Sequence, residues 1–117
     1  MNTKTPECYT SDSPARCLRV EVTATHFLVL PLDQFVFAEL DGDGKEQKLR
    51  LVFATHEIVI FGHVLRRIET ALHRMELSSI MKLPDKYHSL IGEGQPKIRE
   101  IAVTETKPPG QSGDVLN

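Results

Sequence analysis

The chain has 117 residues, of which 40% are apolar and 26% are charged, and its formal net charge is -2. This length and composition are typical of one globular domain with its own core, rather than of a disordered or membrane-spanning chain. The slight net acidity argues against a dedicated nucleic-acid binder, because such proteins usually carry a clear excess of basic side chains.

No segment approaches the roughly 20 apolar residues of a transmembrane helix. The polar N-terminus also lacks the apolar core of a secretory signal. Cys8 and Cys17 are the two cysteines of the chain, too few for a disulfide framework. We therefore expect a cytoplasmic protein with reduced thiols that does not associate with membranes.

The two ends of the chain differ from its middle in composition. Residues 1–16 and 105–117 hold few apolar side chains, so burial cannot offset the entropy that their ordering would cost. We expect a mobile N-terminal arm over residues 1–16, one α+β domain over residues 17–104 and a disordered C-terminal tail over residues 105–117. No internal repeat divides the middle part further.

The domain begins with a series of short strands. Apolar and polar side chains alternate over the first of them with the period of a half-buried strand, and the later ones are denser in apolar residues. Two Asp-Gly pairs at residues 41–44 predict a hairpin turn, because glycine tolerates positive φ. Residues 86–96 are expected to be a loop. The expected strands are residues 18–23, 26–30, 34–40, 48–54, 58–61, 78–83 and 98–103.

After Gly62 the apolar residues recur at the spacing of a helix instead of a strand. From about residue 63 to 76 they lie three or four positions apart, which predicts an amphipathic helix with one apolar face. The apolar face consists of Val64, Leu65, Ile68, Ala71, Leu72 and Met75. We therefore expect an α+β fold: a mainly antiparallel sheet or partly coiled barrel of about six or seven short strands, with this helix packed on it.

Three of the strands carry apolar side chains on both faces, at residues 27–30, 35–37 and 58–61. Neighbouring side chains of a strand point to opposite faces, and one helix covers only part of one face. The sheet therefore either coils into a barrel with its own interior or packs its second face against another subunit. We expect self-association, most simply as a two-fold dimer.

The segment Asp41-Gly42-Asp43-Gly44 has the spacing of the middle of a calcium-binding EF-hand loop. Aligned on that loop, the position that needs a bidentate glutamate holds Arg50, and the flanking segments are strands instead of helices. An arginine would repel the cation. A hairpin turn therefore explains the segment better than a calcium site.

The five histidines of the chain do not show the spacing of a metal site. The pair His56-Glu57 begins a metalloprotease pattern, but that pattern needs a second histidine at the position of Ile60. His63 and His73 would lie about 15 Å apart along a helix, too far to share an ion. We expect no metal ligands and no cofactor, and leave open a metal site assembled between subunits.

No catalytic residue is identified. The chain has no Gly-x-Ser-x-Gly nucleophile elbow, and no serine or cysteine stands in a recognisable context of histidine and carboxylate. The glycines at Gly92 and Gly94 flank an acidic residue and lack the lysine and serine of a phosphate-binding loop. An enzyme whose site forms between two subunits stays open as an alternative.

The polar face of the expected helix carries a cluster of basic side chains. Guanidinium groups on one ridge are suited to phosphates or to an acidic partner. Glu69 lies three or four residues from Arg66 and His73, however, and such pairs are typical of an ordinary solvated helix face. The candidate binding residues are Arg66, Arg67, His73 and Arg74.

Three functional hypotheses follow from the sequence. The leading one is a small non-catalytic cytoplasmic protein that acts by associating with itself or with another protein. The alternative is a protein that binds nucleic acid or a phosphate ligand through the four candidate residues. The third is the enzyme with a site between subunits.

Overall fold

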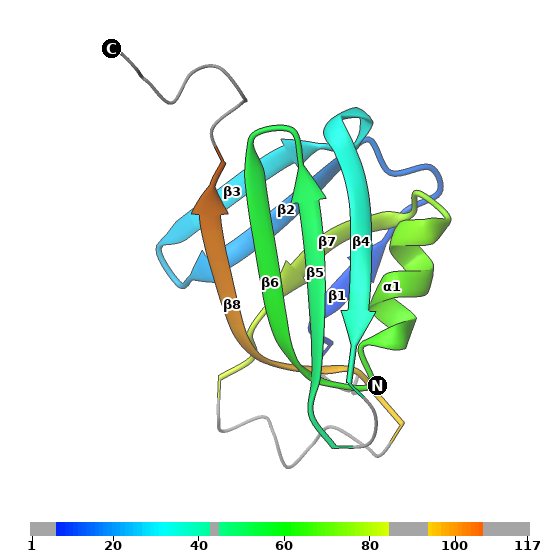
Figure 1. Cartoon of the computed structure of the whole chain (residues 1–117), viewed down its shortest axis with the longest axis vertical. Coiled ribbons are helices and arrows are strands. Elements are labelled where there is room, and N and C mark those ends of the chain that lie inside the picture. Colours follow the sequence, from blue (N-terminus) through cyan, green and yellow to red (C-terminus); the bar gives the residue numbers. More distant parts are fainter. Residues whose placement is uncertain (1–6, 43–44, 85–93, 107–117) are drawn as a thin grey trace, which may run out of the picture.

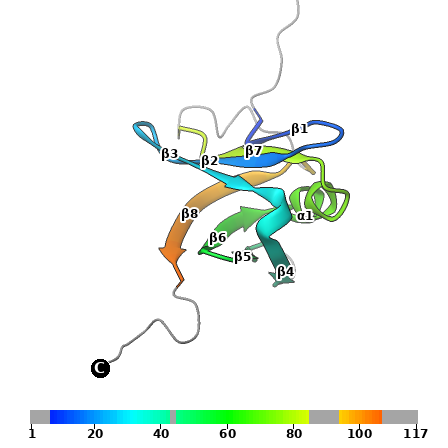
Figure 2. The same cartoon turned by 90° about the horizontal axis from the view of Figure 1, so that it is seen from above.

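The computed structural model of the protein describes residues 7–42, 45–84 and 94–106. In these residues eight strands form two four-stranded sheets that face each other, and one α-helix lies at their side (Figures 1 and 2). Sheet A consists, in spatial order, of β1 (Tyr9–Ser11), β7 (Leu77–Met81), β2 (Cys17–Thr23) and β3 (His26–Pro31). Sheet B consists of β4 (Phe35–Asp41), β5 (Gln47–Phe53), β6 (His56–His63) and β8 (Lys97–Glu105).

Strands that follow one another in the chain pair antiparallel, because their connections are short. This holds for β2 with β3, β4 with β5, and β5 with β6. The short 3-10 turn η1 (Leu32–Gln34) leads from sheet A to sheet B, and the helix α1 (Arg66–His73) follows β6. After α1 the chain returns to sheet A, where β7 pairs parallel with β2 and antiparallel with β1. Figure 1 shows the strands of sheet A running across those of sheet B.

The core lies between the two sheets, and α1 closes it at one side (Figure 2). In β5 and β6 every second side chain is buried, as the period of a strand requires when only one face meets the core. The helix contributes Ile68, Ala71 and Leu72, all of them buried. Each large apolar side chain buried in this way stabilises the fold by about 1.5–3 kcal/mol.

The structure confirms an α+β fold with mainly antiparallel pairing and one helix, but it corrects the architecture. The described residues form eight strands instead of six or seven, and two sheets instead of one sheet or a closed barrel. The chain leaves sheet A at η1, where the buried side chain of Leu32 fixes the change of direction. This change of sheet replaces the coiling that the apolar strands predicted.

The helix is shorter than the predicted range of about 63–76. His63 still pairs with Lys97 as the last residue of β6, so the strand continues past the expected break at Gly62. Val64 then has a φ of 54°, a left-handed conformation that cannot belong to a right-handed helix. Of the predicted apolar face, Leu65 and the three core residues of α1 are buried, whereas Val64 is half-buried and Met75 is exposed.

The expected mobile N-terminal arm over residues 1–16 contains ordered structure in the part that the structure describes. Cys8 is 1% exposed and belongs to the core, and β1 pairs with β7. The N–H of Asp12 also donates to the carbonyl of Glu76, at 2.8 Å. This segment is held mainly by backbone hydrogen bonds. A prediction based on apolar side chains could therefore not detect the strand. Residues 1–6 lie outside the described part of the chain.

Other expected connections fall partly outside the described residues. β4 and β5 pair antiparallel, and Asp41 opposite Lys48 is the pair nearest the turn, which confirms the predicted hairpin. Gly42, in the turn, has a positive φ of 105°. Residues 43–44 of the turn and most of the expected loop 86–96 are not described. At the C-terminal end β8 extends to Glu105, and residues 107–117 of the expected tail are not described.

Two nested backbone hydrogen bonds cap the C-terminus of α1. The N–H of Glu76 donates to Ala71, and the N–H of Met75 donates to Leu72, both at 2.8 Å. This is the Schellman arrangement, in which the residue after the cap takes a left-handed conformation and is usually glycine. Here that residue is Met75, with a φ of 57° and a side chain that is 39% exposed.

Replacing Met75 by glycine should therefore stabilise the protein relative to Met75→Ala. Both variants remove the same side chain, but only glycine adopts positive φ without the steric cost of a Cβ, a difference of about 1 kcal/mol. Thermal or chemical denaturation of the two variants measures the difference. At an ordinary helical position alanine would be the more stable variant, so that order would contradict the left-handed geometry.

Candidate functional site

A groove of about 370 Å³ lies between α1 and β1. We refer to it as the arginine groove, because three arginines line it. The helix contributes Arg66, Arg67, Thr70, Ala71 and Arg74, and the opposite side contributes Tyr9, Ser11 and Glu76. It holds more basic side chains than the four other concavities of the described residues that we compared with it.

Helical spacing brings the three arginines to one ridge. Arg66 and Arg67 begin α1, and Arg74 stands two turns later, at its C-terminal cap. Residues three, four and seven positions apart share one side of a helix, so Arg67 and Arg74 flank the small side chain of Ala71. The Cα atoms of Arg66 and Arg74 are separated by about 12 Å along the axis.

The arginines of the groove carry no ion pair with any described acidic side chain. The expected pairing of Glu69 with Arg66 and His73 is not formed between these residues. Their positive charges are therefore not neutralised by a neighbouring carboxylate in the described part of the chain. Glu76 is the acidic residue of the groove lining.

Two other arginines behave differently. Arg50 lies on the outer face of sheet B and pairs with Glu57 and with Glu39. Arg99 donates to the carboxylate of Glu46 from Nε at 3.0 Å and from Nη2 at 2.6 Å. The hydrogen bonds that they donate to these carboxylates raise the pKa of both guanidinium groups above its usual value. Both side chains stabilise structure within the chain.

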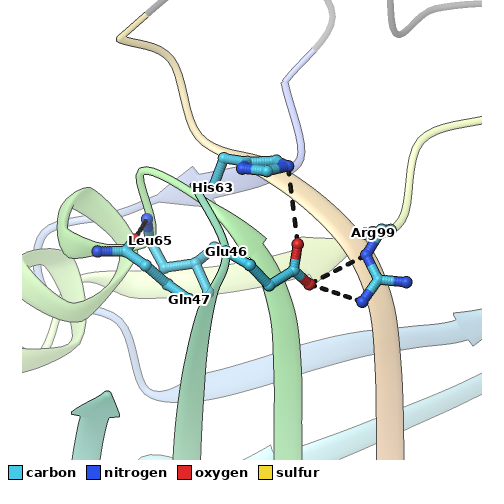
Figure 3. A network of polar contacts seen from close by, with 5 residues as sticks. All are labelled: Glu46, Gln47, His63, Leu65 and Arg99. Carbon is cyan, nitrogen blue, oxygen red and sulfur yellow. Dashed lines mark hydrogen bonds and ion pairs between the residues drawn. The ribbon is translucent and has the colours of Figure 1, made fainter. Parts of the chain in front are cut away.

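Polar contacts at the beginning of β5 in sheet B hold the start of α1 in place. Figure 3 shows Glu46 between Arg99 of β8 and His63 of β6, with the His63 Nε2 at 3.9 Å from the Glu46 carboxylate. The next residue, Gln47, accepts a hydrogen bond at its Oε1 from the N–H of Leu65, at 2.8 Å. This bond satisfies a backbone donor at the N-terminus of the helix. It fixes the residue that immediately precedes the first two arginines.

The structure brings together three of the four candidate residues from the sequence. Arg66, Arg67 and Arg74 line the groove, whereas His73 is exposed and does not line it. Tyr9 and Ser11 were not predicted as site residues, because both lie in the expected N-terminal arm. They reach the groove only through the long-range pairing of β1 with β7.

A larger hollow of about 500 Å³ lies beside the turn between β2 and β3. Its lining is mainly apolar, and its charged members, Glu21 and Lys82, have opposite signs. It contains no histidine or cysteine and no group of like charges. The arginine groove is therefore chemically more specific than this larger hollow.

The buried thiol of Cys8 lies close to the groove, beside Tyr9 and Arg67. Burial raises the pKa of this thiol from 9.0 to about 11. Because the pKa is raised on folding, burial of the neutral thiol stabilises the fold below pH 9.0, and this stabilisation is lost as the pH rises toward about 11. A protonated, buried thiol is a poor nucleophile.

Among the described residues no three histidine, cysteine, aspartate or glutamate side chains lie close enough together to hold a metal ion. In the same residues no helix has the length and apolar character needed to cross a membrane. Comparison of the chain with protein-family models, with curated proteins and with solved structures finds no match.

The two cysteines should differ sharply in reactivity. Cys17 is exposed and Cys8 is buried with a raised pKa, so iodoacetamide should modify one thiol of the native protein rapidly and the other only after denaturation. Intact-mass spectrometry over time measures this, and the Cys17→Ser variant should lose the fast phase. Equal rates at both thiols would contradict the burial of Cys8.

Proposed function

We propose that the protein is a non-catalytic cytoplasmic binding protein whose arginine groove holds a phosphate or carboxylate group of its ligand. The observation that supports this proposal is the convergence of Arg66, Arg67 and Arg74 on one groove without acidic partners among the described residues. On this ground we rank anion binding above self-association.

The chemistry of the lining suits such a ligand. A guanidinium group presents several N–H donors in a plane and can bind two oxygens of one phosphate or carboxylate at once. The hydroxyl groups of Tyr9, Ser11 and Thr70 add donors of a second kind. The lining holds three arginines and one acidic side chain, Glu76, so its net charge is positive and favours an anionic ligand.

The proposal assigns the groove to binding instead of a chemical reaction. Its lining contains neither histidine nor cysteine, the side chains that most often transfer protons or attack a substrate near neutral pH. Arginine keeps its proton at any physiological pH, so it stabilises negative charge but does not act as a base. These residue types are those of an anion-recognition site.

Replacing Arg67 or Arg74 by alanine should weaken the binding of inorganic pyrophosphate about tenfold, since a hydrogen bond to a charged group is worth about 1.5–3 kcal/mol. Isothermal titration calorimetry or NMR titration at low and at high salt measures the affinity, which should fall as salt rises.

Two variants serve as matched controls. His73→Ala changes an exposed residue of the same helix that does not line the groove, and Arg16→Ala removes an exposed arginine elsewhere on the surface. Both should bind pyrophosphate as the unchanged protein does. Equal losses in Arg16→Ala and Arg74→Ala would show that only the overall charge matters, and would refute a specific site.

Self-association is the second candidate function, and the outer faces of the sheets support it. On β3, Phe27 is 45% and Val29 is 57% exposed, and on β4, Val36 is 61% and Phe37 is 43% exposed. Sheet B adds Val59, which lies half-buried beside Arg50 on the same outer face. Exposed apolar side chains that gather on one face of a sheet are typical of interaction surfaces.

Arginines cover part of this apolar surface within the chain. The guanidinium carbon of Arg19 lies 4.6 Å from the centre of the Phe27 ring, and that of Arg50 lies 5.4 Å from the centre of the Phe37 ring. Such cation–π contacts shield the rings from water on one side. They reduce the need for a second subunit, which is why we rank this function second.

If the outer face of sheet B joins two copies, the purified protein should be a dimer at micromolar concentration. The Val59→Lys variant should then be a monomer with a similar melting temperature, because a charge on this face is tolerated in water but not inside an interface. Light scattering coupled to size-exclusion chromatography measures the mass. A monomeric unchanged protein would rule out this candidate.

A further inference from the structure

We propose that the ligand of the arginine groove is an extended peptide segment of a partner protein, with acidic or phosphorylated side chains at alternate positions. In this proposal the segment adds as a strand to the open edge of β1. The inference rests on the proposed function and goes further, because it names the class of partner and its manner of binding.

Within residues 7–42, 45–84 and 94–106, no strand pairs with the outer edge of β1. β1 is the outermost strand of sheet A, and β7 is its neighbour. The carbonyl of Cys8 accepts a bond from the N–H of Met81, and the N–H of Asp12 donates to Glu76, both at 2.8 Å toward the β7 side.

In an antiparallel strand the backbone groups of alternate residues point to the same side. The pairing shifts register between Thr10 and Ser11, but the bonds of Cys8 and Asp12, on both sides of the shift, point toward β7. Tyr9 and Ser11, which alternate with these residues, therefore direct their N–H and C=O groups to the outer edge. A free row of this kind is the template that strand addition uses.

The arginine groove lies directly beside this edge. Tyr9 and Ser11, whose backbone groups face the open side, also line the groove together with the arginines of α1. A strand added next to β1 would continue sheet A over the groove. Every second side chain of that strand would then face the arginines, since side chains on one face of a strand repeat at about 6.8 Å.

This repeat is shorter than the spacing of the basic groups along α1, and the length of the arginine side chains makes up the difference. Arg67 and Arg74 are separated by about 10.5 Å along the axis of α1, and their long side chains can reach anionic groups that lie closer together than that. Two acidic or phosphorylated residues at alternate positions would therefore each meet a guanidinium group. Backbone pairing supplies affinity, and the arginines select for charge.

A second copy of this chain is a poorer occupant of the edge. Pairing of two β1 strands would bring the three unneutralised arginines of each copy toward the other, and β1 itself carries no acidic side chain to offset them. A nucleic acid offers phosphates but no backbone N–H and C=O groups that match the row on β1. An acidic peptide satisfies both features.

The test uses fluorescein-labelled peptides with three phosphoserines at alternate positions in a threonine and valine background. One control peptide has the same composition with the phosphoserines consecutive, and another carries N-methyl groups on the backbone amides that would pair with β1. Fluorescence anisotropy should show both controls to bind about tenfold more weakly, because one loses alignment with the arginines and the other loses the backbone bonds.

Two measurements on the protein separate strand addition from anion binding. The alternating peptide should slow hydrogen exchange at the amides of Tyr9 and Ser11, whereas pyrophosphate should not. Ser11→Pro, which lacks the edge N–H, should bind the peptide about tenfold more weakly than Ser11→Ala, which keeps it.

The outcomes distinguish strand addition to β1 from anion binding by the groove. Equal binding of all three peptides, with pyrophosphate binding still dependent on the arginines, would overturn strand addition and leave the anion site intact. An affinity for pyrophosphate that is unchanged by the arginine replacements would overturn the proposed function itself. A single-stranded oligonucleotide of equal charge that binds more tightly than the alternating peptide would overturn the peptide as partner.

Discussion

The pairing of β7 with β1 on one side and with β2 on the other is the interaction on which the rest of the structure depends. β7 directly follows α1, so its place in sheet A decides where the helix lies. Leu77 and Ile80 of β7 are fully buried, and their burial anchors the strand between its two neighbours. The arginines of α1 thereby come to lie beside β1, which is far away in the sequence.

The distribution of arginines shows how one residue type serves two purposes. Arg50 binds glutamates of its two neighbouring strands, Arg99 binds Glu46 just before β5, and Arg19 lies against an exposed aromatic ring. These side chains neutralise charge or cover apolar surface within the chain. The arginines of the groove do neither in the described residues, so their charge is available to a ligand. This difference in environment, more than the number of arginines, carries the functional argument.

The proposed mode of binding combines two weak features of the fold. β1 is a three-residue edge strand, and an edge strand leaves backbone groups unpaired. The groove beside it leaves charges unpaired. Neither feature alone defines a partner, because edges are common and exposed arginines usually meet water. Their adjacency limits the ligand to one that supplies backbone groups and negative charge together, at the repeat of an extended chain.

The sequence by itself determined the elements whose signal is local. Alternating side chains predicted β2, and runs rich in apolar residues predicted β5 and β8. Helical spacing predicted the core residues of α1 and the arginines of its opposite face. These patterns need only neighbouring residues, because burial of one face imposes the period.

Only the tertiary structure decided the rest. β1 has no apolar alternation and is held by backbone bonds to β7, and the division into two sheets follows from η1 and from the return of the chain after α1. The groove requires Tyr9 and Arg74 to meet across 64 intervening residues. No local period records such a contact, because it depends on which strands pair and not on what each strand contains.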